Sequence, residues 1–125
     1  MRQNTLSDGE WKLMNLLWQE GGASLGQMVE ALREDTGWSK ATVNIMLGRL
    51  ADQGAVKALE GRPRRWVPLL SREEAVREEA KSVLRRVRSG GLGLLLSTMA
   101  ESCDLSEAEV EELTAILREG GRRRD

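Results

Sequence analysis

The stretch from Trp38 to Leu70 decides the fold: WSKATVNIMLGRLADQGAVKALEGRPRRWVPLL. It opens with a helical pattern that begins after Ser39, a residue type preferred at the N-cap, and that ends at Gly54. Apolar side chains recur along one face of this helix at i, i+3, i+4 and i+7, namely Val43, Met46, Leu47 and Leu50. The other face carries small, polar and basic residues with one isoleucine: Lys40, Ala41, Thr42, Asn44, Ile45, Gly48 and Arg49. The pattern predicts an amphipathic helix that turns its first face toward a core.

A short β-hairpin is predicted directly after this helix, with strands at residues 55–59 and 65–69 and a turn at residues 60–64. Six basic residues gather in the helix and the hairpin: Lys40, Arg49, Lys57, Arg62, Arg64 and Arg65. Two acidic residues, Asp52 and Glu60, oppose them, so this stretch carries +4 while the whole chain carries −1. A helix with a polar outer face followed by a basic hairpin is typical of a winged helix-turn-helix, and it predicts a DNA-binding regulator.

Two further helices are predicted before this stretch. The first spans residues 7–20, begins with a Ser7-x-x-Glu10 capping box and ends at Gly21-Gly22. Its apolar residues are expected in the core, the two tryptophans included: Trp11, Leu13, Met14, Leu17 and Trp18. The second begins at Ser24 and has an apolar stripe of Leu25, Met28, Val29 and Leu32. With a turn at Thr36-Gly37, the order matches a helix-turn-helix, whose second helix enters the major groove.

Three short amphipathic helices are predicted after the hairpin. The first begins at Ser71 and ends at residues 89–91, and the second spans residues 92–101. The third begins at Ser106 and ends at Gly120-Gly121, before a frayed tail at residues 122–124. The first and third each start with an S-x-x-E capping box.

About fifty residues cannot readily bury such stripes alone, and a symmetric homodimer would cover them. The residues expected in the dimer interface are apolar: Val83, Leu84, Val87, Leu92, Leu95, Leu96, Met99, Val110, Leu113, Ile116 and Leu117. We therefore expect a mainly α protein with a small β-hairpin wing. A winged helix-turn-helix DNA-binding domain is predicted at residues 1–70, followed by a C-terminal helical dimerisation domain at residues 71–125.

The composition argues against an enzyme, a metal site or an intrachain disulfide. The 125 residues include no histidine, the commonest metal ligand and general base, and one cysteine, Cys103. No cofactor is expected. No segment approaches the ~20 continuous apolar residues of a membrane span, and the N-terminus lacks the apolar run of a secretory signal. We therefore expect a cytoplasmic protein without membrane insertion.

Four segments together resemble the penicillinase-repressor family of the BlaI/MecI/CopY type. They are LSDGEWKLMNLLW at 6–18, GWSKATVNIMLGRLADQGAV at 37–56, EGRPRRWVPL at 60–69 and the acidic SEAEVEEL at 106–113. The resemblance covers most of the chain. It implies a homodimeric winged-helix repressor that occupies a palindromic promoter operator in double-stranded DNA and dimerises through its C-terminal helices.

The resemblance also implies a mode of release. One branch of the family is cleaved in its dimerisation region after a membrane-bound metallopeptidase sensor, or a downstream protease, responds to a signal. By position, the candidate cleavage site is Thr98-Met99, and packing in the dimer core is the favoured alternative for this pair. The copper-responsive branch carries a Cys-x-Cys pair near the C-terminus. This chain has Cys103 alone, which disfavours that branch because thiolate metal sites need several sulfurs.

The candidate DNA-binding residues are Ser39, Lys40, Thr42, Asn44, Ile45, Arg49, Arg62, Arg64 and Arg65. Ser39 has a purely structural alternative as the N-cap, and Arg49 has one as an ion-pair partner of Asp52. Neighbouring residues alternate across a strand, so at most one of Arg64 and Arg65 is expected to face DNA squarely.

The recognition helix departs from the family at two points. Family members often have a lysine one position after Lys40, and one step along a helix turns a side chain by about 100°. Lys40 is therefore expected to contact phosphate. Ile45 stands where a polar residue is frequent in the family, and it can touch a thymine methyl group.

Two other functions fit the same sequence pattern. One is a winged-helix regulator that responds to a small ligand, although the chain has few of the aromatic and polar groups that usually line such a pocket. The other is a winged-helix module for protein–protein contact without DNA binding. DNA-binding measurements separate the two.

Overall fold

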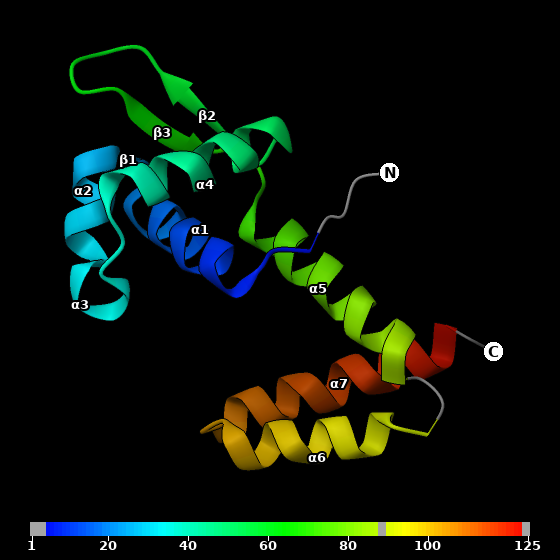
Figure 1. Cartoon of the computed structure of the whole chain (residues 1–125). Helices are drawn as coiled ribbons and strands as arrows, with labels where there is room; N and C mark the ends of the chain where they lie inside the picture. The colour runs from blue at the N-terminus through cyan, green and yellow to red at the C-terminus, as the bar shows by residue number, and fades with distance from the viewer. Residues whose placement is uncertain (1–4, 88–89, 124–125) are drawn as a thin grey trace. The chain divides into compact units, whose positions relative to one another are not determined.

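Figure 1 shows the computed structural model of the chain, which describes residues 5–87 and 90–123. The elements in order are α1 (Asp8–Glu20), β1 (Ala23–Ser24), α2 (Leu25–Ala31), α3 (Arg33–Thr36), α4 (Lys40–Asp52), β2 (Val56–Leu59), β3 (Arg65–Pro68), α5 (Arg72–Val87), α6 (Leu92–Ser102) and α7 (Glu107–Arg123). They form two compact units, Met1–Val83 and Leu84–Asp125. The mainly helical fold with a small sheet confirms the predicted fold class.

Serine caps fix the start of most helices. The predicted capping box of Ser7 on α1 is present, and the boxes of Ser71 on α5 and Ser106 on α7 are present as well. A further box, in which Gln27 pairs with Ser24, starts α2 and was not predicted. In the Ser71 box the backbone N–H of Ser71 donates to the carboxylate of Glu74, which lowers the pKa of Glu74 below its ordinary value.

The sheet has three strands, whereas the sequence predicted a two-stranded hairpin. Its order is β1-β3-β2, and both neighbouring pairs are antiparallel. The strand missed is β1, where Ala23 pairs with Trp66. Two residues are too few for an alternating pattern to appear in the sequence, so pairing with β3 reveals the strand only in the fold.

A second difference lies between α2 and α4. The sequence predicted a turn at Thr36-Gly37, and the structure adds the single-turn helix α3 just before Gly37. Gly37 ends this helix in the left-handed conformation, with φ of 67°. The turn itself is therefore where it was predicted, with an extra helical turn leading into it.

One hydrophobic core holds the first unit together. Its fully buried side chains come from α1, α2, α4 and β2: Leu13, Met14, Leu17, Met28, Val43, Leu47, Leu50 and Val56. Trp11 and Trp18 pack against this core half-buried, with their rings edge to face at 5.9 Å between centroids. The Trp18 indole N–H donates to the Leu70 carbonyl at 2.8 Å, which joins α1 to the end of the hairpin. The core therefore fixes α4 and the hairpin on one support.

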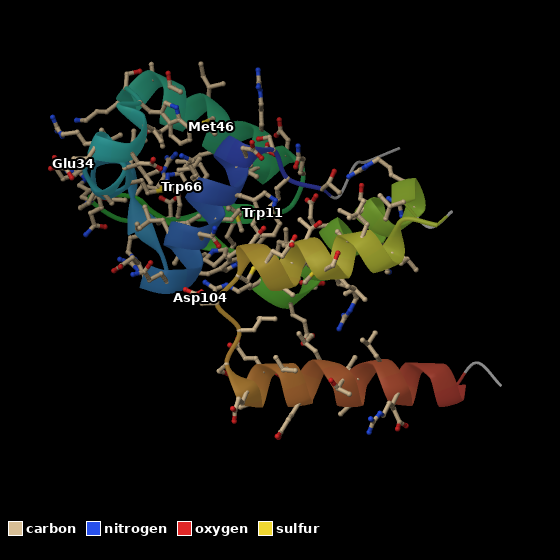
Figure 2. All side chains as sticks on the ribbon, turned by 90° about the horizontal axis from the view of Figure 1, so that it is seen from below. Trp11, Glu34, Met46, Trp66 and Asp104 are labelled. Atoms are coloured by element: carbon tan, nitrogen blue, oxygen red, sulfur yellow. The ribbon has the colours of Figure 1, made fainter. Side chains whose placement is uncertain are left out.

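The second unit is built differently. Helices α6 and α7 run in opposite directions, and Asp104 lies in the segment that joins them (Figures 1 and 2). None of the side chains described between residues 90 and 120 is buried. No helix in the described ranges is long and apolar enough to cross a membrane.

The end of α7 differs from the end that the sequence predicted. The prediction that Gly120-Gly121 ends the last helix is wrong, because α7 continues to Arg123. A glycine weakens a helix by about 1 kcal/mol relative to alanine, and it ends a helix when it adopts the left-handed conformation, as Gly21 does at φ 73° after α1. Helix α5 ends at Val87, while the predicted end at Ser89 and the tail residue Arg124 lie outside the described residues.

Candidate nucleic-acid interface

Helix α4 is held rigidly at both ends. The hydroxyl of Ser39 accepts the backbone N–H of Thr42 at its start. At its end Gly54 takes the left-handed conformation with φ of 81°, and the N–H of Ala55 donates to the Leu50 carbonyl at 2.9 Å. These bonds fix where α4 stops and where the strand β2 begins.

The two faces of α4 are divided as predicted. Val43, Leu47 and Leu50 are fully buried, and Met46 is half-buried. All the candidate DNA-binding residues of the helix are exposed: Ser39, Lys40, Thr42, Asn44, Ile45 and Arg49. Figure 1 shows the β2–β3 hairpin projecting from this unit on the side of α4. The helix therefore presents its polar face beside the wing.

A hollow between α4 and the wing brings three candidate residues together. Lys40 and Asn44 line it from α4, and Arg64 lines it from the wing. The rest of its wall is formed by Leu25, Gly26, Pro63 and Trp66. Two of these, Leu25 and Gly26, begin α2 and were not predicted as part of the site. The sequence predicted that this helix begins at Ser24, but no local signal shows that its first turn lies against α4 and the wing.

Arg65 points elsewhere. It lines a separate hollow with Leu16, Glu20, Gly22, Ala23, Gln27 and Ala31. A Cβ atom built on Gly22 would lie 2.8 Å from its guanidinium, so this side chain lies over the glycine turn after α1. Arg64 and Arg65 thus diverge as alternation along a strand requires, and Arg64 is the one that lies beside α4.

The basic residues of this surface form no ion pair with another described residue. Among the residues that the structure describes, no ion pair engages any of Lys40, Arg49, Lys57, Arg62, Arg64 and Arg65. The expected alternative pair of Arg49 with Asp52 is therefore not formed. Elsewhere in the described chain, cations are paired with carboxylates, as Lys12 is with Asp35, Arg33 with Glu30, Arg77 with Glu73 and Lys81 with Glu78. The positive charge of α4 and the wing is therefore left for an external anion.

The two hydroxyls at the start of α4 have defined roles. Ser39 Oγ accepts the Thr42 N–H and also donates to Thr42 Oγ1, both at 3.2 Å. The capping role of Ser39 is thus confirmed. Thr42 Oγ1 accepts in this pair, so its own hydrogen remains free to be donated to a phosphate or a base.

Substitutions at Ser39 separate its capping role from a contact with phosphate. Asparagine and aspartate both cap helices well, so Ser39→Asn and Ser39→Asp should leave the free energy of unfolding within about 0.5 kcal/mol of the wild type. The aspartate adds a negative charge to this surface, so Ser39→Asp should weaken DNA binding by about tenfold or more while Ser39→Asn changes it little. Urea unfolding and fluorescence anisotropy measure the two effects. Equal DNA affinities for these two variants would show that residue 39 lies away from phosphate.

Comparison with known proteins assigns the chain to a family. The family model for the penicillinase repressor matches residues 6–119. The methicillin resistance regulatory protein MecI of Staphylococcus aureus is 27% identical over 90% of this chain and 92% of its own length. The penicillinase repressor of Bacillus licheniformis is 29% identical over 91% of this chain and 90% of its own length.

A solved structure supports the fold of the first unit. It is the solution structure of the DNA binding domain of the repressor BlaI, which matches with a TM-score of 0.52 and 24% identity. The match covers 58% of this chain and 90% of that domain, and it identifies the fold as a winged helix. Taken with the family match over nearly the whole sequence, this confirms the resemblance seen in the sequence: the chain belongs to the penicillinase repressor family.

Proposed function

We propose that this protein is a transcriptional repressor that binds double-stranded DNA, with α4 in the major groove and the β2–β3 wing on the flanking phosphates. The observation that carries the proposal is the set of cations around the outer face of α4 and on the wing that form no ion pair within the described chain. Phosphate neutralisation by such residues supplies most of the affinity of DNA-binding proteins. In helix-turn-helix proteins the second helix reads base edges in the major groove, which supports this role for the exposed face of α4.

We also propose that the repressor acts as a homodimer on a palindromic operator. The support is the composition of α6, which is apolar on nearly all sides: Leu92, Leu95, Leu96 and Met99 share one face and Leu94 lies on the opposite one. A helix that is hydrophobic all round is normally buried, yet Leu94 is 73% exposed in the single chain. A second copy, packed on α6 and α7, would cover both faces, and a two-fold dimer would match two-fold half-sites.

Binding to a labelled duplex from the DNA upstream of the gene tests the proposal. Fluorescence anisotropy at 50 and 200 mM salt should show binding that weakens by about 10³-fold or more, as six or more phosphate contacts require. An unrelated duplex of the same length should bind more weakly at both salt concentrations. If the full-length protein binds neither duplex at 50 mM salt, the DNA-binding proposal fails and a protein–protein role takes its place.

Release by proteolysis is the third part of the proposal, through a membrane-bound metallopeptidase sensor or a protease downstream of it. The candidate site Thr98-Met99 lies inside α6 with both residues exposed, and the Thr98 hydroxyl donates to the Leu94 carbonyl at 2.7 Å. Cleavage in a helix requires local opening, so dimer packing would slow it. Mass spectrometry of the protein from induced cells should find a fragment that ends near Thr98. Full derepression with intact chains only would rule this mode of release out.

A further inference from the structure

Ile45 is the feature of the DNA-facing surface that charge does not explain. Its side chain is 58% exposed in the middle of α4, on the face away from Val43 and Leu47. In the described part of the chain it does not pack against the hydrophobic core. This isoleucine therefore does not stabilise the buried core. We look for its role in the partner that α4 contacts.

The neighbours of Ile45 on the helix surface let it project. Residues at i−4 and i+3 are Ala41 and Gly48, which have little or no side chain. A Cβ atom built on Gly48 would meet no described atom within 4 Å, so a partner can approach the backbone closely there. On the other edge, at i−3 and i+4, stand Thr42 and Arg49, which can donate hydrogen bonds. Ile45 is thus an apolar projection beside a line of hydrogen-bond donors.

The major groove offers one apolar group on its base edges, the C5-methyl group of thymine. An isoleucine packed against cytosine or guanine would strip water from polar base-edge atoms without replacing their hydrogen bonds. Against a thymine methyl group, the same side chain gains an apolar contact instead. We infer that Ile45 makes this protein select a thymine methyl group at one defined position in each half-site of its operator. The inference rests on the DNA-binding function proposed above.

Deoxyuridine tests the inference because it lacks only the methyl group. The full-length protein first selects duplexes from a randomised pool, and each symmetric pair of thymines in the selected duplex is then replaced by deoxyuridine. At one pair the replacement should lower affinity by about fourfold per half-site, the value of one buried methyl group, and by about fifteenfold for both. For Ile45→Ala, the same replacement should change affinity by less than about twofold. Leu69→Ala, which removes an exposed apolar side chain outside α4, should keep the full loss.

Two failures are distinguishable. If the wild type binds the selected duplex but no deoxyuridine pair weakens it, or if Ile45→Ala retains the full loss, the role of Ile45 is overturned while DNA binding stands. If the full-length protein selects no duplex at all at low salt, the DNA-binding function fails and the inference falls with it.

Discussion

Replacement of Ile116 by aspartate should convert the proposed dimer into monomers and weaken operator binding by at least a hundredfold. Ile116 is 58% exposed on α7 in the single chain, on the same face as Leu113 and Leu117. Burying an isoleucine side chain stabilises an interface by about 1.5–3 kcal/mol. In a two-fold dimer the substitution occurs in both subunits, so this stabilisation is lost twice. A buried unpaired carboxylate adds a further penalty. Because two half-sites are bound together, loss of the dimer removes the second half-site from each binding event.

Ala115→Asp provides the matched control for this variant. It places the same charge one position earlier, on the side of α7 opposite its apolar face. Light scattering after size-exclusion chromatography should report a dimer for Ala115→Asp and a monomer for Ile116→Asp, both with native helix content by circular dichroism. Leu94→Asp should repeat the result from α6. Dimers that persist in both Ile116→Asp and Leu94→Asp would place the interface elsewhere.

Replacement of two wing arginines by alanine should change the salt dependence of DNA binding more than any other substitution proposed for this surface. Arg62 and Arg64 are exposed and without ion pairs in the described chain, and Arg64 lies beside Lys40. Each phosphate contact contributes about 0.9 to the slope of log K against log salt concentration. In a dimer, Arg62→Ala plus Arg64→Ala would remove four contacts and reduce the slope by about 3.6. Anisotropy titrations from 50 to 300 mM salt measure it.

The control for the wing removes the same charge from a surface assigned no contact with DNA. Arg77 and Lys81 on α5 are paired with Glu73 and Glu78, so their replacement by alanine should leave the slope unchanged. Arg65→Ala should alter the slope less than Arg64→Ala, because Arg65 lines the hollow beside Glu20. An unchanged slope in the Arg62 and Arg64 double variant would remove the wing from the binding surface.

The sequence correctly predicted those elements that depend only on neighbouring residues. The N-cap residue Ser39 and the apolar stripe that follows it predicted correctly where α4 begins and which of its faces is buried. Capping and helix periodicity depend only on residues that are close in the sequence. The hairpin strands were also placed to within one residue. The strand β1 was missed because two residues carry no pattern, and only pairing with β3 creates it.

The arrangement of the site depends on packing between distant segments. No sequence rule shows that Lys40, Asn44 and Arg64 line one hollow, because α4 and the wing meet only after the core assembles. Alternation predicted that Arg64 and Arg65 diverge, but not which of them lies beside α4. The predicted interface did not include Leu94, because this residue lies off the apolar stripe of α6. The structure shows that the Leu94 side chain is exposed in the single chain, which adds it to the apolar surface that the proposed dimer would bury.

Hydroxyl-radical footprinting of the full-length protein on its selected duplex tests the central claim most directly. A dimer that inserts two copies of α4 into the major groove should protect two patches related by two-fold symmetry. Their centres should lie about 34 Å apart, one turn of the duplex, or a whole multiple of that. A single patch without a symmetric mate, or protection spread evenly along the duplex, would contradict a dimeric repressor that reads a palindrome through α4.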